Sequence, residues 1–381
     1  MDFSLTPEQQ EWQTAAIEFA KTSLADDMIA RDHKGEFSRK LWQKCADFGV
    51  QGLPVPEKYG GNGADVSTAI AVMEGLGYGC KDAGLLFSIN AHLWTNSVPI
   101  LLYGTEEQKQ KYLPGLCNGA LIGANGASEP ESGSDVFAMK TKAVKKGDRY
   151  ILNGTKMFVT NAQVSDLIVA YATLDEKMGV LGICGFIIEK GFPGVSISKK
   201  IDKMGLRTSP MAEIVFENCE VPAANLLGRE GRGAEVFNCS MEWERSCILA
   251  SCLGTMRRQI DKCVEYARMR KQFGKPIGKF QSVANRIVDM KVRLETARPL
   301  VYKIGWLKDQ GKSAVAEAAM AKLYLSESFV KSSLDAIQVY GGYGYMTECE
   351  LERDLRDAVG SQLYSGTSEI QRNIIASMMG L

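Results

Sequence analysis

The sequence predicts an α+β protein built from three consecutive parts, which are helical, then β, then helical again. Amphipathic helical segments fill residues 1–120 and return after residue 228, and runs rich in β-branched residues lie between them. Helices and strands do not alternate as βαβ units, which argues against a doubly wound sheet. We expect an N-terminal all-α domain (1–120), a central β-barrel or sandwich domain (121–228) and a C-terminal four-helix bundle (229–381).

Capping signals support the helices of the first part. Thr6 and Thr105 each stand just before glutamates that open an amphipathic run, as helix N-caps do. The glycine-rich stretch 59–63 separates two of these helices.

Four runs predict the strands of the second part. Each combines β-branched or aromatic residues with Gly, Asn or Pro at its ends. They are residues 149–160, 166–174, 182–190 and 212–222. Long helical periodicity then follows over 285–311 and 313–340, where glycines end both runs.

Composition excludes several classes of function. Lys plus Arg and Asp plus Glu both number 45, without a long run of like charge, so we expect no nucleic-acid partner. The chain begins without a signal-peptide pattern and contains no run that approaches about 20 apolar residues. We therefore expect a cytoplasmic protein without a membrane span.

Histidine and cysteine chemistry is also disfavoured. The chain has only two histidines, His33 and His92, and its ten cysteines form no Cys-x-x-Cys pair. A Ser-His-Asp triad or a metal site is therefore not expected. Since neither a G-x-G-x-x-G turn after a strand nor a P-loop occurs, carboxylates or another cofactor must carry the chemistry.

Four segments, taken in order, resemble the acyl-CoA dehydrogenase family. They are ASEPESGSD (127–135), NGTKMFVTN (153–161), RMRKQFGKPIGKFQ (268–281) and the stretch from QVYGGYGYMT to LYSGTSEIQR (338–372). The resemblance spans nearly the whole chain and implies FAD as the cofactor.

The resemblance also implies which residues meet the flavin ring. Ser128 would hydrogen-bond the isoalloxazine, Thr160 would approach its N5 atom, and Ser134 would touch the arm of an acyl thioester. Phe158 stands where many relatives carry tryptophan, so we expect weaker stacking on the flavin.

Further residues match family positions that hold the rest of FAD across a subunit boundary. For the pyrophosphate and adenosine these are Arg270, Phe273, Gln281, Gln338, Gly341 and Gly342, and Thr367 and Glu369 match a stretch that contacts the nucleotide. A plain helix cap is the alternative for Thr367. A site shared between chains implies a homotetramer or a dimer.

The chain departs from many relatives at the catalytic base. Those relatives place a glutamate just before the Gly-Thr-Ser of the last motif, where this chain has Ser365. A second family pattern places the base on an earlier helix before an arginine, and Glu244-Arg245 matches it. We expect Glu244 to be the base and Arg245, Tyr364 and Ser365 to contact the substrate.

The helical neighbours of Glu244 support this assignment. None of the residues three or four positions away can form an ion pair with it; they are Ser240, Met241, Cys247 and Ile248. We expect burial to raise its pKa, as a general base requires. Glu242, in contrast, has Arg245 three residues on, which suits a solvated surface pair.

The proposed reaction is oxidation of an acyl thioester. Glu244 would remove the α-proton while a hydride leaves the β-carbon for the flavin, and the backbone N–H of Ser365 would stabilise the developing enolate. The sequence leaves the electron acceptor open.

A finer resemblance concerns the substrate. The position of the base, the serine at 365 and the compact length resemble prolyl-carrier-protein oxidases and dehydrogenases of natural-product pathways, which implies an L-prolyl thioester on a carrier protein. Basic runs at 140–149 and 199–207 are candidates for the carrier entrance, or simply solvated faces. Two alternatives stay open: a short- or branched-chain acyl-CoA dehydrogenase, and a flavin-binding relative without activity.

Overall fold

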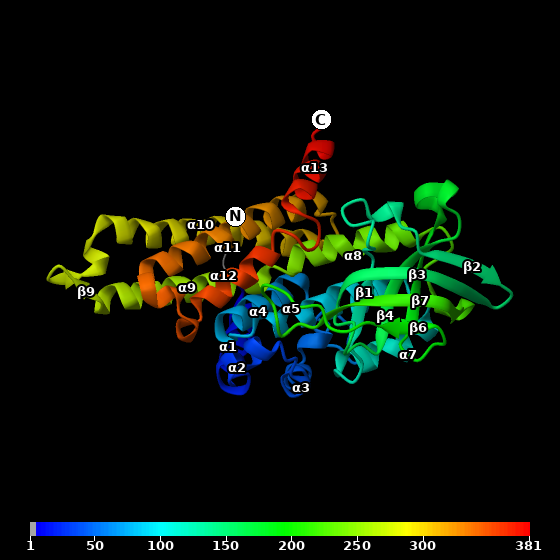
Figure 1. Cartoon of the computed structure of the whole chain (residues 1–381), viewed down its shortest axis with the longest axis horizontal. Helices are drawn as coiled ribbons and strands as arrows, with labels where there is room; N and C mark the ends of the chain where they lie inside the picture. Colours follow the sequence, from blue (N-terminus) through cyan, green and yellow to red (C-terminus); the bar gives the residue numbers. More distant parts are fainter. Residues whose placement is uncertain (1–4) are drawn as a thin grey trace.

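The computed structural model describes residues 5–381 and has three parts (Figure 1). Helices of the first part lie beneath a long helical bundle, and the sheet lies at one end of the molecule. The predicted order of helical, β and helical parts is confirmed. We propose domain boundaries near residues 120 and 228, where one type of element gives way to the other.

Residues 5–120 contain seven α-helices, with a π-helical turn between two of them. They are α1 (Pro7–Ser23), α2 (Met28–Lys34), α3 (Arg39–Asp47), α4 (Val66–Gly79), α5 (Ala83–His92), the turn η3 (Leu93–Ser97), α6 (Val98–Tyr103) and α7 (Glu106–Cys117). Thr6 and Thr105 cap α1 and α7 as predicted, and each forms a capping box with the glutamine three residues on.

The expectation that no segment is long and apolar enough to span a membrane is wrong. The continuous segment Ala83–Tyr103 passes that test by length and composition. Within its most apolar window 89% of the residues are buried inside the protein, as in the core helix of a globular domain. Its apolar character is therefore explained by contacts with the protein's own helices and sheet.

The central part is one sheet of eight strands. They are β1 (Gly123–Gly126), β2 (Lys142–Lys146), β3 (Arg149–Thr160), β4 (Leu167–Thr173), β5 (Ile183–Glu189), β6 (Val195–Ile197), β7 (Met211–Pro222) and β8 (Leu226–Leu227). Their order is β6-β7-β3-β2-β4-β5-β8, and β1 pairs in parallel with β4. The four predicted runs correspond to β3, β4, β5 and β7.

The sheet folds over an apolar core of its own. Tyr150 of β3 meets Phe186 of β5 edge to face, with ring centroids 5.1 Å apart, so the two halves of the sheet face each other. The other side of β4 and β5 packs on helices, where Tyr171 meets Phe237 at 5.4 Å. Because both faces are covered, β4 is buried throughout.

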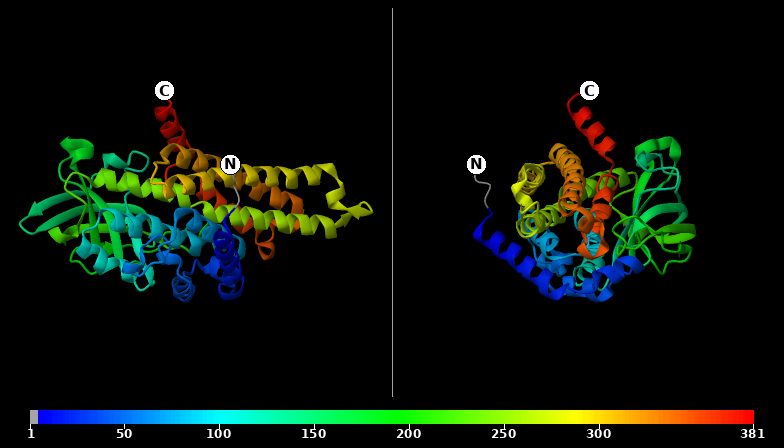
Figure 2. Two further views of the ribbon diagram at one scale, coloured as in Figure 1. Left: turned by 180° about the vertical axis from the view of Figure 1, so that it is seen from behind. Right: turned by 60° about the vertical axis from the view of Figure 1, so that its left-hand side comes forward.

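The C-terminal part is a bundle of long helices that carries a β-hairpin at its tip (Figure 2). Its elements are α8 (Gly233–Cys247), α9 (Ala250–Met269), β9 (Lys271–Gln272), β10 (Lys275–Pro276), α10 (Gln281–Asp309), α11 (Val315–Tyr340), α12 (Leu351–Gly360) and α13 (Ser368–Met378). The last helix, α13, points away from the bundle in both views.

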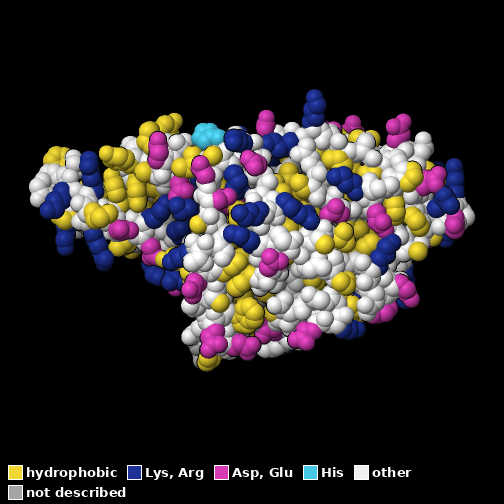
Figure 3. Space-filling model, turned by 90° about the horizontal axis from the view of Figure 1, so that it is seen from below, with side chains coloured by type: hydrophobic (Ala, Val, Ile, Leu, Met, Phe, Trp, Pro, Cys, Tyr) yellow, Lys and Arg dark blue, Asp and Glu magenta, His cyan; other side chains and the backbone are white. Residues whose placement is uncertain are grey.

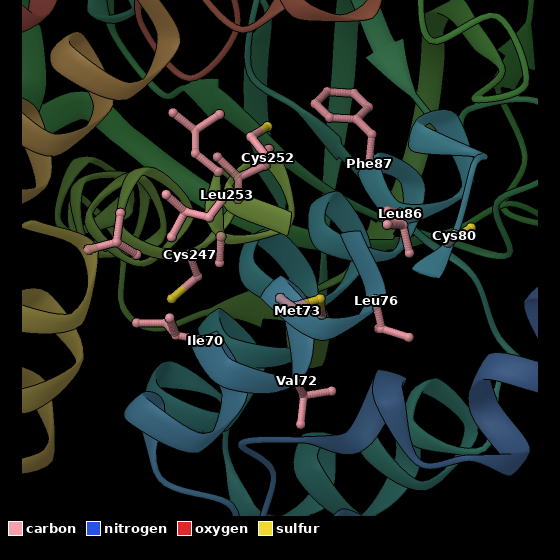
Figure 4. Packing of buried hydrophobic residues seen from close by; sticks show 14 of the residues in the cluster. Ile70, Val72, Met73, Leu76, Cys80, Leu86, Phe87, Cys247, Cys252 and Leu253 are labelled. Atoms are coloured by element: carbon pink, nitrogen blue, oxygen red, sulfur yellow. The ribbon is translucent and has the colours of Figure 1, made fainter. Parts of the chain in front are cut away.

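A glycine contact brings the two helical parts together. An added Cβ at Gly254 of α9 would lie 2.0 Å from the carbonyl oxygen of Glu74 in α4, so only glycine fits there. Around this crossing Met73 and Leu76 pack against Leu253 in one continuous apolar core (Figure 4). This core fixes α8 and α9 against the N-terminal helices.

His92 joins the helical core to the sheet and has a structural role. Its Nδ1 accepts the N–H of Gly123 at 2.9 Å, and its Nε2 lies 3.2 Å from the carbonyl oxygen of Leu116. Burial lowers its pKa to about 3, so the ring stays neutral. On the face of the molecule that Figure 3 shows, acidic and basic side chains are interspersed.

Candidate active site

Glu244 lies on α8 with its side chain turned into the protein. Only 8% of the residue is exposed, and burial raises the pKa of its carboxyl to about 7. Ser365, Arg245 and Lys322 oppose this rise because they favour the charged form. The carboxyl is therefore balanced between its two protonation states near neutral pH, as expected of a general base.

The expected surface pair between Glu242 and Arg245 is wrong. Glu242 accepts instead from Lys308 Nζ at 3.0 Å and from the N–H of Ala314 at 3.0 Å. Arg245 turns toward the C-terminal segment, where its Nε donates to the carbonyl oxygen of Ser365 at 3.0 Å. Glu242 and Arg245 thus each bind a residue far away in the sequence, Lys308 and Ser365, in place of each other. Only the packing of distant segments provides such partners, so the spacing along the helix did not predict them.

Ser365 lies beside both Glu244 and Arg245, although it follows Arg245 by 120 residues in the sequence. Its hydroxyl favours the charged form of the Glu244 carboxyl but forms no full hydrogen bond. Position 365, at which the resemblance places the base of many relatives, therefore lies beside the glutamate that this chain carries on α8.

The turn at Ser365 has an unusual backbone. Ser365 has φ 57° and Gly366 has φ 88°, both in the left-handed region. A non-glycine residue pays a conformational cost there, so surrounding contacts must hold it. The Ser365 N–H has no acceptor within residues 5–381, which leaves a free donor next to Glu244.

Two side chains that sequence analysis missed also hold this turn. Lys322 donates to the carbonyl oxygen of Gly366 at 2.6 Å, and Gln371 donates to the carbonyls of Ser365 and Gly366 at 3.2 and 2.9 Å. The sequence did offer a signal for Lys322, because this lysine stands among alanines and apolar residues in the run VAEAAMAKLYL, where a buried polar role is expected.

Aromatic rings form the walls near the carboxyl. Tyr364 lies against Phe87 of α5 with ring centroids 4.6 Å apart. Trp243, the neighbour of Glu244, stacks on Trp94 of the π-helical turn at 6.0 Å. Tyr364 also lies close enough to the Glu244 carboxyl to interact with it electrostatically, and burial of this region explains the desolvation of that carboxyl.

The residues expected at the flavin ring lie at the C-terminal end of the interior strand β3, beside the loop that carries Ser128, and we call this region the sheet edge. Phe158 has φ 57° at a register shift between β3 and β7 and is 58% exposed. The neighbouring N–H of Met157 donates to the carbonyl oxygen of Ser128 at 2.8 Å, and Thr160 is half-buried two residues beyond Phe158. Ser128, Phe158 and Thr160 therefore come together at the sheet edge.

A buried ion pair fixes this edge. Lys156 is fully buried and donates to Glu129 Oε1 at 2.7 Å. Glu129 also accepts the backbone N–H groups of Lys140 and Thr141 at 2.6 and 3.1 Å. The pair links the strand that carries Phe158 to the loop that carries Ser128.

The positions of Ser134, Thr367 and Glu369 neither support nor contradict their predicted contacts with a ligand. Ser134 is exposed on a turn that the Ser132 hydroxyl closes by donating to the carbonyl oxygen of Asp135. Thr367 caps α13 and accepts the N–H of Ile370 at 3.3 Å, and Glu369 is exposed. The capping interpretation of Thr367 is thus observed, and a contact with a nucleotide stays a prediction.

A second group of predicted residues gathers at the tip of the bundle. A cavity of about 790 Å³ lies there, lined among others by Arg270, Phe273, Gln338, Gly341 and Gly342. Added Cβ atoms at the two glycines would meet nothing within 4 Å, so their backbone is open to a ligand. Gln281 is exposed at the start of α10, next to the lining residues Phe280 and Ser282.

One chain does not bring the two predicted groups together. The edge with Phe158 belongs to the sheet at one end of the molecule, and the cavity lies at the other end, beside β9 (Figure 1). A ligand that uses both groups therefore needs a second chain.

Comparison with known proteins identifies the family. Models of the acyl-CoA dehydrogenase N-terminal, middle and C-terminal domains match residues 6–120, 124–219 and 231–380. The chain is also 41% identical, over the full length of both proteins, to an L-prolyl-[peptidyl-carrier protein] dehydrogenase of Pseudomonas fluorescens. This chain belongs to the acyl-CoA dehydrogenase family.

Two solved structures match this chain over nearly its whole length. The prolyl acyl carrier protein oxidase AnaB is 52% identical over 99% of this chain and 100% of its own, with a TM-score of 0.98. PigA, whose structure contains FAD and proline, is 42% identical over 100% of both chains, also with a TM-score of 0.98.

The residues of this family member fit FAD. A dinucleotide needs an open aromatic face, a cation for its pyrophosphate and backbone that allows close approach. Phe158 supplies the first, Arg270 the second, and Gly341 with Gly342 the third, because their surroundings are open. The assignment of individual contacts stays a prediction.

Proposed function

We propose that this chain is an FAD-dependent dehydrogenase or oxidase of an acyl thioester, with L-proline on a carrier protein as the substrate. The observation that carries the proposal is the buried Glu244 carboxyl beside the free N–H of Ser365. A base and a donor at one point are what α-proton removal from a thioester requires.

Each residue has a definite task in this reaction. The Glu244 carboxylate takes the α-proton, and the electrons of the broken C–H bond move toward the thioester carbonyl oxygen. The Ser365 N–H donates to that oxygen as negative charge develops on it. Bound FAD supplies the acceptor for the hydride that leaves the β-carbon. The burial of Glu244 keeps bulk water away from its carboxyl.

The proposed prolyl substrate is supported by two similar proteins, an L-prolyl-[peptidyl-carrier protein] dehydrogenase and a prolyl acyl carrier protein oxidase. The first predicted carrier entrance does not support it as a free basic surface. Lys140 and Lys142 both pair with Glu176, and Lys145 pairs with Glu230.

The second predicted entrance, 199–207, is largely occupied by internal contacts. Lys200 donates to the carbonyl oxygens of Lys34 and Gly35, and Lys203 donates to that of Ser209. Arg207 donates to backbone carbonyls of the N-terminal part. Carrier recognition therefore requires another surface or few charged contacts.

The assembly and location belong to the same proposal. The separation of the two predicted groups of FAD residues supports an oligomer in which each FAD contacts two chains, and we propose a homotetramer. We place the protein in the cytoplasm, where a carrier-bound substrate and reduced cysteines are both expected.

A panel of thioesters tests the function. Purified protein with FAD is mixed with prolyl-carrier protein, prolyl-CoA or isovaleryl-CoA, and bleaching of the flavin is followed by stopped flow. We expect the prolyl-carrier thioester to bleach it fastest. Fast reduction by isovaleryl-CoA alone would assign a branched-chain acyl-CoA dehydrogenase instead, and a yellow protein that no thioester reduces would indicate a non-catalytic relative.

A further inference from the structure

Three side chains from three helices converge on two consecutive carbonyl oxygens beside Glu244. Arg245 of α8 donates to Ser365, Lys322 of α11 donates to Gly366, and Gln371 of α13 donates to both. The distances lie between 2.6 and 3.2 Å. We call these three residues the turn clamp.

Two members of the turn clamp are entirely enclosed. Lys322 and Gln371 are both 0% exposed. Within residues 5–381 no carboxylate lies within ion-pair distance of Lys322, although Glu244 and Glu369 interact with it electrostatically. Burial of such a lysine costs free energy, and a charge-assisted hydrogen bond to Gly366 recovers part of it. Within residues 5–381 Lys322 has that carbonyl as its hydrogen-bond partner. Its position is therefore coupled to the turn.

The clamp counteracts the conformational cost of the turn. Ser365 is a non-glycine residue with φ 57°, which without such contacts would favour another backbone region. The donors on the Ser365 and Gly366 carbonyl oxygens fix the 365–366 and 366–367 peptide groups. The preceding peptide group, 364–365, carries the Ser365 N–H, which has no acceptor within residues 5–381.

We propose that Lys322 and Gln371 are positioning residues that hold the Ser365–Gly366 turn so that the Ser365 N–H meets the thioester carbonyl oxygen next to Glu244. This role rests on the proposed function. It accounts for a buried lysine and a buried glutamine that never touch the reacting atoms. Because the oxygen gains charge only as the α-proton leaves, a misplaced donor slows the reaction more than it weakens binding.

The test separates enolate stabilisation from turnover. Acetoacetyl-pantetheine, a β-keto thioester that ionises to an enolate, is titrated against the FAD-loaded enzyme, and the apparent pKa of the bound ligand is read from enolate absorbance across pH. The variants are Lys322→Met, Lys322→Arg and Gln371→Leu. Thermal midpoint and FAD content are measured on each, and kcat and KM are measured with the prolyl-carrier thioester.

For Lys322→Met we expect about ten-fold less bound enolate at a given pH and a kcat lowered roughly 10- to 100-fold. This decrease in kcat is smaller than that for removal of an oxyanion donor, because the Ser365 N–H is displaced but still present. KM should stay within about three-fold, since ground-state contacts persist. Lys322→Arg should restore both quantities to within about three-fold, because a cation still reaches the carbonyl. Gln371→Leu should act in the same direction and reports on the clamp if Lys322→Met does not fold.

Two results would overturn the proposal. One is a folded, FAD-loaded Lys322→Met enzyme with the enolate population and kcat of the wild type. The other is a fall in kcat with an unchanged enolate population. If the wild type ionises acetoacetyl-pantetheine but does not oxidise the prolyl thioester, the prolyl substrate fails, and a shifted enolate population in Lys322→Met still supports the positioning role.

Discussion

At the scale of single residues the chemistry centres on one carboxyl group that has been removed from water. Glu244 is buried among apolar and aromatic side chains, and its few polar neighbours keep the pKa of its carboxyl near neutrality. On a solvent-exposed face of a helix, a glutamate would be an ordinary ionised acid at neutral pH. Its environment, more than its identity, therefore makes it a candidate base.

Substitution of the base tests its role. Glu244→Gln keeps the shape of the side chain but cannot accept a proton, so flavin bleaching by the substrate should slow about 10²- to 10⁴-fold. FAD content should not change, because glutamine has nearly the size of glutamate and remains polar. Stopped-flow reduction measures the rate and the visible spectrum measures bound FAD. Normal reduction by this variant would exclude Glu244 as the base.

The raised pKa of Glu244 also predicts how activity and stability depend on pH. The base must be deprotonated, so kcat/KM should rise to half of its plateau near pH 7 as the carboxyl of pKa about 7 ionises. The neutral carboxyl stabilises the fold below its ordinary pKa of 4.5, and this contribution is lost as pH rises through about 7. Thermal midpoints of Glu244→Gln should therefore exceed those of the wild type above neutral pH.

At the scale of elements two devices hold the site in place. A buried ion pair ties β3 to the loop between β1 and β2, and a glycine crossing ties α9 to α4. Both fix elements that carry predicted site residues at their ends. Neither device is visible as a local sequence pattern, since each joins residues far apart in the chain.

Loss of the buried ion pair should destabilise the sheet edge. Lys156→Met leaves Glu129 buried without its cation, which should cost roughly 3–5 kcal/mol of unfolding free energy. Urea unfolding measures it. The matched control is Lys140→Met, whose pair with Glu176 is exposed and should contribute less than about 1 kcal/mol. Equal effects of the two substitutions would contradict this account.

The glycine crossing makes a second prediction at this scale. Gly254→Ala places a Cβ against the backbone of Glu74, so α4 and α9 must separate, and we expect a loss of about 1–3 kcal/mol. Gly191→Ala is the control, because an added Cβ there meets nothing within 4 Å. Differential scanning calorimetry of both variants checks the difference. An unchanged midpoint for Gly254→Ala would show that the helices can adjust.

At the scale of the whole molecule the important feature is the distance between two halves of a predicted cofactor site. The sheet edge with Phe158 and the cavity with Arg270 lie at opposite ends of one elongated chain. A second chain, related by symmetry, can place its tip over the sheet edge of the first. Folding and assembly would then both be required before FAD binds tightly.

A complementation experiment tests this arrangement. Arg270→Ala and Glu244→Gln should each inactivate a homo-oligomer. In a mixed pair the intact Glu244 of one chain should work with the intact Arg270 of the other. Co-expression should restore up to about a quarter of wild-type activity, since half of random pairs are mixed and each has one intact site. If both residues served the same chain's site, no activity would return.

The sequence by itself determined the order of helical and β parts, the positions of β3, β4, β5 and β7 and the likeness to the acyl-CoA dehydrogenase family. These features depend on local periodicity, capping and short motifs, which neighbouring residues encode. It also selected Glu244, because the absence of helical partners is a local property. The burial that sets the pKa of this carboxyl was only an expectation at that level.

The tertiary structure alone decided the partners of the charged groups. It paired Glu242 with Lys308 instead of Arg245, placed Ser365 beside Glu244 and brought Lys322 onto a carbonyl 44 residues away. It also showed that the apolar segment 83–103 is covered by protein. Such contacts depend on which helices pack together, and hydrogen bonds and burial between distant segments leave no regular trace in the chain.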